Sequence, residues 1–126
     1  MKKILFASIS ILFTVCAFAQ VKSVSAVEFK KKITLTKNEQ LIDVRSPQEF
    51  REYRIAGAKN IEFRNDDFQK RIEHLDKDKP VLVYCLRGIR SRYAMDILRE
   101  AGFKIVYELE GGLIAWIRAE KAVEWL

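Results

Sequence analysis

Short apolar runs and amphipathic stretches alternate along most of the chain, which is typical of an α/β fold with a largely parallel sheet. The short apolar runs indicate buried strands. Apolar residues spaced three or four apart indicate helices with one face against a core. The pattern predicts strands over 41–44, 59–61, 81–84 and 105–109, and helices over 25–32, 46–53, 66–75, 91–101 and from 112 to 123.

Three helix ends carry capping signals. Ser25 is followed three residues later by Glu28, and Ser46-Pro47-Gln48-Glu49 has the residue types of a complete helix start. Gly102-Phe103 predicts a left-handed cap with a hydrophobic closure. These signals define where the predicted helices begin and end.

The first nineteen residues have a different pattern. Two lysines precede an uncharged, mostly apolar run over 4–15, and Ala17-Phe18-Ala19 puts small residues at the two positions that a signal peptidase reads. A membrane-spanning helix needs about 20 apolar residues, more than this run provides. The pattern therefore predicts a signal peptide over 1–19, cleaved after Ala19, and one domain over 20–126 that is exported to the periplasm or secreted, without a permanent membrane span.

Composition favours a single soluble globular domain, since 49% of the residues are hydrophobic and 32% are charged. Without the predicted signal peptide, 107 residues with a net charge of +4 remain, and a chain of this length buries about two thirds of its unfolded surface. We expect no metal site and no cofactor. The basic residues are spread along the chain, which disfavours nucleic-acid binding and is compatible with small anionic substrates.

Cys85 is the only cysteine outside the predicted signal peptide, which contains Cys16. The alternative is a lipoprotein lipidated on Cys16, although the two residues before it are larger than those of a lipoprotein signal. A lone cysteine in an exported chain is either buried filler or a reactive group. Two arginines and a glycine within the next five residues favour the reactive interpretation.

The loop that carries Cys85 lies between a buried strand and a helix start. Ligands bind at the carboxyl ends of parallel strands, and the N–H groups of such a loop can converge there on an anion. Gly88 allows the tight curl that this needs, while Arg87, Arg90 and the helix N-terminus favour a thiolate. The segment predicts a nucleophile that holds an anionic sulfur adduct without a general base, because the single histidine, His74, lies on a different helix.

Six motifs, in order and with the family's spacing, resemble those of single-domain rhodaneses. They are Leu41-Ile42-Asp43-Val44-Arg45, Glu49-Phe50, Ile55-Ala56-Gly57-Ala58-Lys59-Asn60-Ile61, Tyr84-Cys85-Leu86-Arg87-Gly88-Ile89-Arg90-Ser91, Gly102-Phe103, and Leu109-Glu110-Gly111-Gly112 with Trp116. The resemblance implies a rhodanese-like α/β fold, in which a central parallel sheet of about five strands is flanked by helices.

The same resemblance implies thiosulfate sulfurtransferase activity, with Cys85 as the catalytic residue that becomes a persulfide. The implied partners are a thiosulfate-like anionic sulfur donor and a thiol or cyanide acceptor. The backbone that cradles the transferred sulfur is expected to be formed by Leu86, Arg87, Gly88, Ile89 and Arg90.

Four residues are expected to support this site: Asp43, Arg45, Glu49 and Ser91. Asp43 matches the family's aspartate at a strand end, and it is expected at the same sheet edge as Cys85, either paired with a loop arginine or capping a turn. Arg45 and Glu49 are expected to form an ion pair across a helix start.

The two loop arginines are expected to differ in role. Arg90 adjoins the helix start and is expected to maintain the loop, whereas Arg87 lies at the tip and is expected either to bind the sulfonate end of thiosulfate or to point into solvent. Where many rhodaneses read Gly-His-Ile-Pro-Gly-Ala, this chain reads Tyr53-Arg54-Ile55-Ala56-Gly57-Ala58. The departure affects the rigidity and electrostatics of that segment rather than the nucleophile.

Other functions are compatible with the same fold, which also hosts phosphatases and arsenate reductases. Four residues separate Cys85 from Arg90, whereas such phosphatases have five, so the loop favours a single sulfur atom over a phosphoryl group. The main alternative from a different class is a non-enzymatic docking module with Trp116 and Trp125 on its surface, although core packing explains both more simply. A thiol-redox protein is disfavoured because the domain has no second cysteine to resolve a mixed disulfide.

Overall fold

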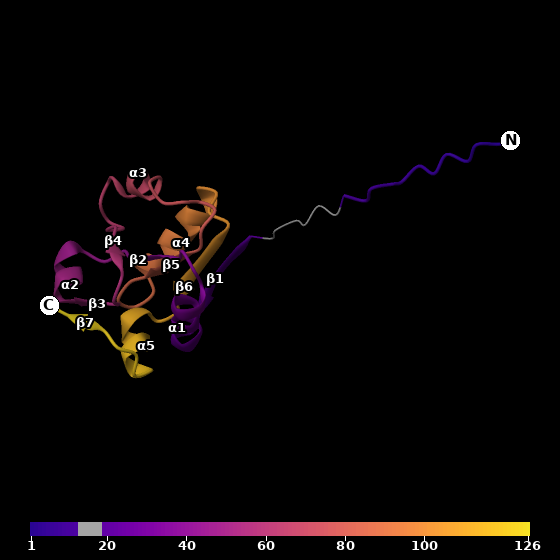
Figure 1. The fold of residues 1–126 in the computed structure, drawn as a ribbon. Coiled ribbons are helices and arrows are strands. Elements are labelled where there is room, and N and C mark those ends of the chain that lie inside the picture. Colours follow the sequence, from indigo (N-terminus) through magenta and orange to yellow (C-terminus); the bar gives the residue numbers. More distant parts are fainter. Residues whose placement is uncertain (13–18) are drawn as a thin grey trace.

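Figure 1 shows a computed structural model of the protein, which describes residues 1–12 and 19–126. Five parallel strands form a central sheet in the order β1-β6-β5-β2-β4, and β3 and β7 form a small antiparallel ribbon. The strands are β1 (Gln20–Val24), β2 (Gln40–Asp43), β3 (Tyr53–Arg54), β4 (Lys59–Asn60), β5 (Val81–Tyr84), β6 (Ile105–Leu109) and β7 (Glu124–Trp125). The helices are α1 (Ala26–Leu35), α2 (Pro47–Glu52), α3 (Phe68–Ile72), α4 (Arg90–Glu100) and α5 (Gly112–Arg118).

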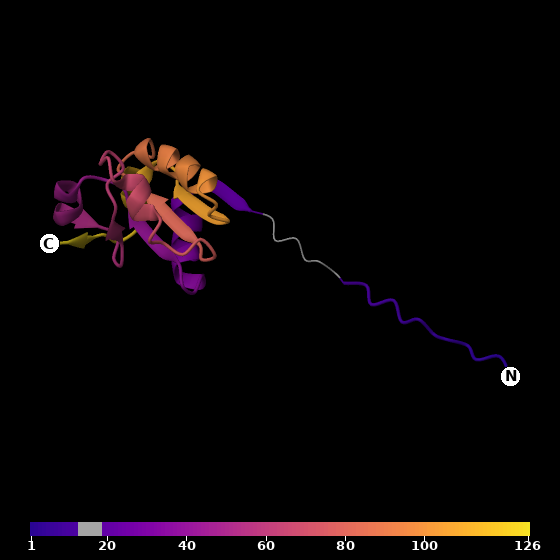
Figure 2. The ribbon, with the colours of Figure 1, turned by 90° about the horizontal axis from the view of Figure 1, so that it is seen from above.

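Helices cover both faces of the central sheet, as the two views in Figures 1 and 2 show. On one face, the core includes Phe68 and Ile72 of α3 and Leu98 of α4. On the other face, α1 and α5 contribute Phe29 and Trp116, whose rings meet edge to face with their centroids 6.1 Å apart. The predicted α/β fold with about five parallel strands flanked by helices is confirmed.

The capping signals are confirmed as well. The Oγ atoms of Ser25 and Ser46 each accept the backbone N–H three residues on at 3.2 Å, and the capping box at Ser46 is complete. After α4, Gly102 adopts φ +95°, a conformation that glycine adopts at little cost. α4 begins at Arg90, one residue before the predicted start at Ser91.

Several elements depart from the predicted pattern. β1 has only two apolar residues, Val21 and Val24, and it pairs along its whole length with β6 at the sheet edge, so no continuous apolar run marks it. α3 spans only part of the predicted 66–75. The terminal helix ends at Arg118, and the chain then forms β7, in which Trp125 lies opposite Tyr53 with ring centroids 4.7 Å apart.

The first twelve residues form neither helix nor strand and extend away from the domain in Figure 1. Within the described parts of the chain, the structure contains no helix with the length and apolar character to cross a membrane. Cys16 and most of the predicted cleavage motif, Ala17-Phe18-Ala19, lie outside the described residues.

Candidate active site

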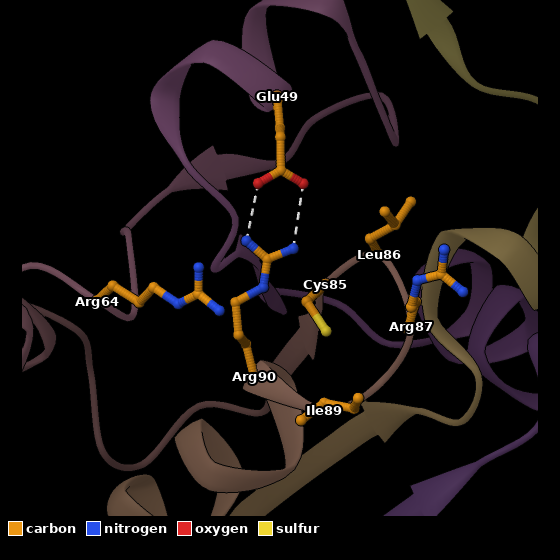
Figure 3. Close-up of a pocket in the computed structure, with 7 residues that line it drawn as sticks. All are labelled: Glu49, Arg64, Cys85, Leu86, Arg87, Ile89 and Arg90. Atoms are coloured by element: carbon orange, nitrogen blue, oxygen red, sulfur yellow. Dashed lines mark hydrogen bonds and ion pairs between the residues drawn. The ribbon is translucent and has the colours of Figure 1, made fainter.

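Cys85 follows β5 at the carboxyl end of the sheet and lines a cavity of about 260 Å³ (Figure 3). Its thiol is free and almost completely buried. The sulfur accepts the backbone N–H of Gly88 at 3.1 Å and that of Ser91 at 3.4 Å. Such converging N–H groups stabilise negative charge on a sulfur atom. The other lining residues are Glu49, Arg64, Leu86, Arg87, Ile89 and Arg90.

Two features of the backbone hold the Cys85 loop in its curled shape. Gly88 adopts φ +85°, which confirms the predicted tight curl. The first turn of α5 contacts the loop, since the N–H of Leu113 donates to the carbonyl of Cys85 at 2.9 Å and that of Ile114 to the carbonyl of Leu86 at 3.1 Å. The loop is therefore fixed by an element that lies far from it in sequence.

Glu49 and Arg90 form a bidentate ion pair beside the thiol (Figure 3), with Nη1 donating to Oε1 at 2.8 Å and Nη2 to Oε2 at 3.1 Å. The hydrogen bond from Arg90 is the main reason that the pKa of Glu49 falls from 4.5 to about 2. The same bond raises the pKa of Arg90. Because Glu49 is also part of the capping box of α2, the guanidinium is held in one orientation.

The predicted ion pair between Arg45 and Glu49 is wrong, because Arg45 pairs with Asp43 instead. Nη2 of Arg45 donates to Oδ2 of Asp43 at 2.8 Å, and both side chains are at most 1% exposed. Burial acts to lower the pKa of Arg45, but the hydrogen bond and charge of Asp43 raise it. The backbone N–H of Arg45 also donates to Oδ1 at 2.9 Å, so Asp43 caps the turn after β2 and pairs with no arginine of the Cys85 loop.

Asp43 nevertheless lies at the sheet edge that the sequence predicts. In the pairing of β2 with β5, Asp43 is opposite Tyr84, the residue before Cys85. Arg45 also donates to the carbonyl of Tyr53 at 2.5 Å. The Asp43–Arg45 pair therefore links the end of β2 to β3 beside the site.

The cavity rim carries two arginines without a carboxylate partner among the described residues. Arg64, in the segment between β4 and α3, points towards Arg90 in Figure 3, and sequence analysis does not identify it because no motif marks it. Arg87 is exposed, and its guanidinium is directed away from the sulfur. Ile89, 62% exposed, adds an apolar part to the rim.

Behind the thiol, Ser91 connects Cys85 to Glu108, another residue that sequence analysis does not identify. The Cys85 sulfur lies 3.3 Å from Oγ of Ser91, whose hydroxyl donates to Oε1 of Glu108 at 2.6 Å. The Ser23 hydroxyl donates to Oε2 at 2.6 Å. Glu108 is a single acidic residue in the apolar run of β6, and only the packing of β1 and α4 against β6 brings the other groups to it.

The chemistry available to this arrangement is nucleophilic, because a buried thiol lies among backbone N–H donors and basic side chains that can stabilise an anion. Within residues 1–12 and 19–126, no group of three or more His, Cys, Asp or Glu side chains is placed to hold a metal ion. His74 lines a different cavity, with Arg71 of α3 and Lys59. Trp116 is buried, so of the two tryptophans considered for docking only Trp125 is exposed.

Comparison with known proteins agrees with this geometry. A model of the rhodanese-like domain family matches residues 25–119. The chain is 39% identical over 89 residues to thiosulfate sulfurtransferase GlpE of Vibrio cholerae, covering 70% of this chain and 81% of that protein, and 38% identical over 88 residues to GlpE of Shewanella oneidensis, covering 70% and 85%. A rhodanese-related protein from Thermoplasma volcanium superposes with a TM-score of 0.72 at 29% identity, over 82% of this chain and 97% of that one.

Proposed function

Because the chain belongs to the rhodanese-like domain family, whose relatives include named sulfurtransferases, we propose that it transfers sulfur from thiosulfate to a nucleophilic acceptor through a persulfide on Cys85. One observation carries the proposal: the Cys85 sulfur accepts two backbone N–H groups and lines a cavity with arginines around it. A thiolate in that place can attack a small anion and hold the resulting anionic adduct.

In the first half-reaction, the Cys85 thiolate attacks the outer sulfur of thiosulfate. A bond forms between Sγ and that sulfur, the sulfur–sulfur bond of thiosulfate breaks, and sulfite leaves with the bonding electron pair. The N–H groups of Gly88 and Ser91 face the sulfur of Cys85, which supports the proposal that they stabilise the persulfide anion. The basic side chains of the cavity attract the dianionic donor.

In the second half-reaction, the acceptor attacks the terminal sulfur of the persulfide. Cyanide would leave as thiocyanate and a thiolate acceptor as a new persulfide, and in each case the bond to Sγ breaks and Cys85 returns as a thiolate. Neither half-reaction consumes an oxidant or a reductant from outside the two substrates. When donor and acceptor react as anions, no proton has to be transferred, which agrees with a site that has no histidine lining the cavity.

Mass spectrometry and an assay of thiocyanate formation test the proposal together. After incubation with thiosulfate, the intact protein should gain one sulfur atom, and Cys85→Ser should neither gain it nor produce thiocyanate. Cys16→Ser in the full chain is the matched control and should behave as the wild type. Added sulfur that persists in Cys85→Ser would contradict the role of Cys85, and a folded wild type that shows neither result would support a docking module.

The length of the loop supports sulfur transfer over phosphoryl transfer. Four residues lie between Cys85 and Arg90, and the N–H groups of Gly88 and Ser91 already contact the thiol sulfur itself. One alanine inserted between Gly88 and Ile89 should widen the loop and reduce thiocyanate formation. Robust hydrolysis of an aryl phosphate by the unaltered protein would contradict this interpretation.

We also propose that residues 1–19 are a signal peptide and that the mature protein is exported. β1 begins at Gln20, the residue after the proposed cleavage site, and the apolar side chains of Ile4, Leu5, Phe6, Ile9, Ile11 and Leu12 are exposed rather than packed on the domain. N-terminal sequencing of the protein recovered from the cell envelope or medium should begin at Gln20. An intact Met1, or a lipid on Cys16, would contradict the proposal.

A further inference from the structure

Glu108 is a fully buried acidic residue without a basic partner. None of the salt bridges among the described residues involves it. Its two oxygens instead accept the hydroxyl groups of Ser91 and Ser23, each at 2.6 Å, a distance typical of a hydroxyl that donates to an ionised carboxylate. Burial of an acidic group here costs free energy that an apolar residue would avoid.

The Ser91 hydroxyl has a single proton, and an ionised carboxylate can only accept one. While Ser91 donates to Glu108, its oxygen faces the Cys85 sulfur, 3.3 Å away, with lone pairs only. In that state Ser91 can accept the proton of a thiol but cannot donate to a thiolate. The charge of Glu108 therefore decides which form of the Cys85 sulfur Ser91 stabilises.

We propose that Glu108 is a positioning residue that acts through Ser91 to hold Cys85 in its thiol form, and that it thereby sets the pH at which the thiolate appears. The negative charge of the carboxylate acts in the same direction as the orientation of the Ser91 hydroxyl, because a like charge disfavours a second anion nearby. The inference rests on the proposed function only in that Cys85 is the sulfur carrier.

Other groups around Cys85 act on the same equilibrium. Two backbone N–H groups contact the sulfur and favour the thiolate, and burial raises the pKa of Tyr84 above its usual value, which keeps that phenol neutral. The basic side chains at the cavity, which also favour the thiolate, are Arg64, Arg87 and Arg90. Two acidic side chains beside the site, Glu49 and Asp43, are each paired with an arginine, Arg90 and Arg45 respectively. Glu108 differs from them because the hydrogen bonds to its carboxylate among the described residues come from hydroxyl groups.

Alkylation of Cys85 by iodoacetamide across a pH range measures this effect without any turnover. In a full chain with Cys16→Ser, Glu108→Gln removes the charge, and when its amide NH2 group faces Ser91 and donates to it, the Ser91 proton is free to face the sulfur. The midpoint of alkylation should fall by about 1 to 2 pH units. Glu110→Gln, which alters an exposed carboxylate two residues away, should leave it unchanged. An unchanged midpoint in Glu108→Gln would overturn the proposal, and a rise would overturn it by making Glu108 the proton acceptor of the thiol.

Sulfur transfer provides a second readout with a distinct signature. In Glu108→Gln, kcat/KM for thiosulfate should rise at acidic pH, where thiolate is scarce in the wild type. At pH values above the alkylation midpoints of both proteins, kcat/KM of Glu108→Gln should be lower than that of the wild type, because a less basic thiolate is a weaker nucleophile. A purely structural defect would lower activity at every pH. Glu108→Met, which suits the apolar surroundings, should shift the alkylation midpoint in the same direction and serves if the glutamine variant does not fold.

The route through Ser91 is tested by a double-mutant cycle. In a Ser91→Ala background, Glu108→Gln should shift the alkylation midpoint by at most half as much as in the wild type, and an equal shift would overturn the role of Ser91. The inference and the proposed function can fail separately. A shifted midpoint in a protein that does not use thiosulfate would contradict only the proposed function, whereas turnover with an unmoved midpoint would contradict only this inference.

Discussion

Glu49 and Arg90, 41 residues apart in sequence, join the first turns of α2 and α4 through two hydrogen bonds of 2.8 and 3.1 Å. A bidentate pair fixes the plane of a guanidinium as well as its position. Arg90 directly precedes Ser91, whose N–H donates to the Cys85 sulfur. The geometry of the thiol therefore depends on a carboxylate from a different helix.

Loss of the ion pair between Glu49 and Arg90 should impair sulfur transfer. In Glu49→Gln, Arg90 loses its charged partner, and we expect kcat/KM for thiosulfate to fall about tenfold or more, because small displacements of reacting groups are costly. Glu124→Gln, which breaks the exposed pair with Arg54, is the matched control and should have no effect. A gain of activity in Glu49→Gln would instead show that the charge of Glu49 opposes donor binding.

The same pair should make stability depend on pH in the acid range. The pKa of Glu49 is lowered from 4.5 to about 2 in the folded protein, so the ionised form stabilises the fold above pH 4.5, and this stabilisation is lost as the pH falls towards 2. The side chain is 31% exposed, so after solvent screening we expect about 1 to 2 kcal/mol. Urea unfolding should show that Glu49→Gln is less stable than the wild type by this amount at pH 7, and that the difference narrows below pH 4.5. A difference that stays constant with pH would contradict the assignment.

Sequence patterns predict the elements of this fold whose signals are local. The apolar run of β5 is one example, because a strand buried on both faces needs apolar residues at every position. The capping box at Ser46 is another, because the hydrogen bonds at a helix start need particular residue types. β1 and β7 carry no such signal. β1 is an edge strand whose partner, β6, lies 85 residues later, and β7 has only two residues, which pair with β3.

The candidate site shows the same division. The Cys85 loop is contiguous, so its nucleophile, its glycine and its arginines can be identified from the sequence. The ion pairs cannot, because Arg45 has carboxylates at two nearby positions, and only the fold places Glu49 next to Arg90. Glu108 is missed for a similar reason, since its hydroxyl partners come from β1 and α4.

Gly112 should be intolerant of any side chain. It adopts φ +60°, and a Cβ there would lie 2.6 Å from the carbonyl oxygen of Cys85 and would overlap that of Leu86. Left-handed strain and overpacking together should destabilise Gly112→Ala by about 2 to 4 kcal/mol. Gly57→Ala is the matched control, because Gly57 has φ +85° but open space around it, so only the conformational cost of about 1 kcal/mol is expected. If chemical denaturation shows that both variants lose the same free energy of unfolding, the contact between Gly112 and the Cys85 loop has no energetic effect.

The last prediction concerns donor recognition by Arg64 and Arg87, the two arginines at the cavity rim. Both side chains are exposed, so each should contribute about 0.5 to 1 kcal/mol to binding of a dianion, the range of a solvent-screened ion pair. This is less than the 1.5 to 3 kcal/mol of a charge-assisted hydrogen bond within a protected site.

Arg64→Ala and Arg87→Ala should therefore each raise KM for thiosulfate by about two- to fivefold and leave kcat nearly unchanged, because neither guanidinium contacts the sulfur. The increase should shrink at high salt, which screens exposed charges, and it should be small for an uncharged sulfur donor. Arg92→Ala, which removes an exposed arginine of α4 that does not line the cavity, is the control for net charge. If only Arg64→Ala raises KM, the donor's charge is bound on the side of the cavity near Arg90, and Arg87 points into solvent. If neither variant raises KM, Arg90 and the backbone N–H groups alone hold the anion.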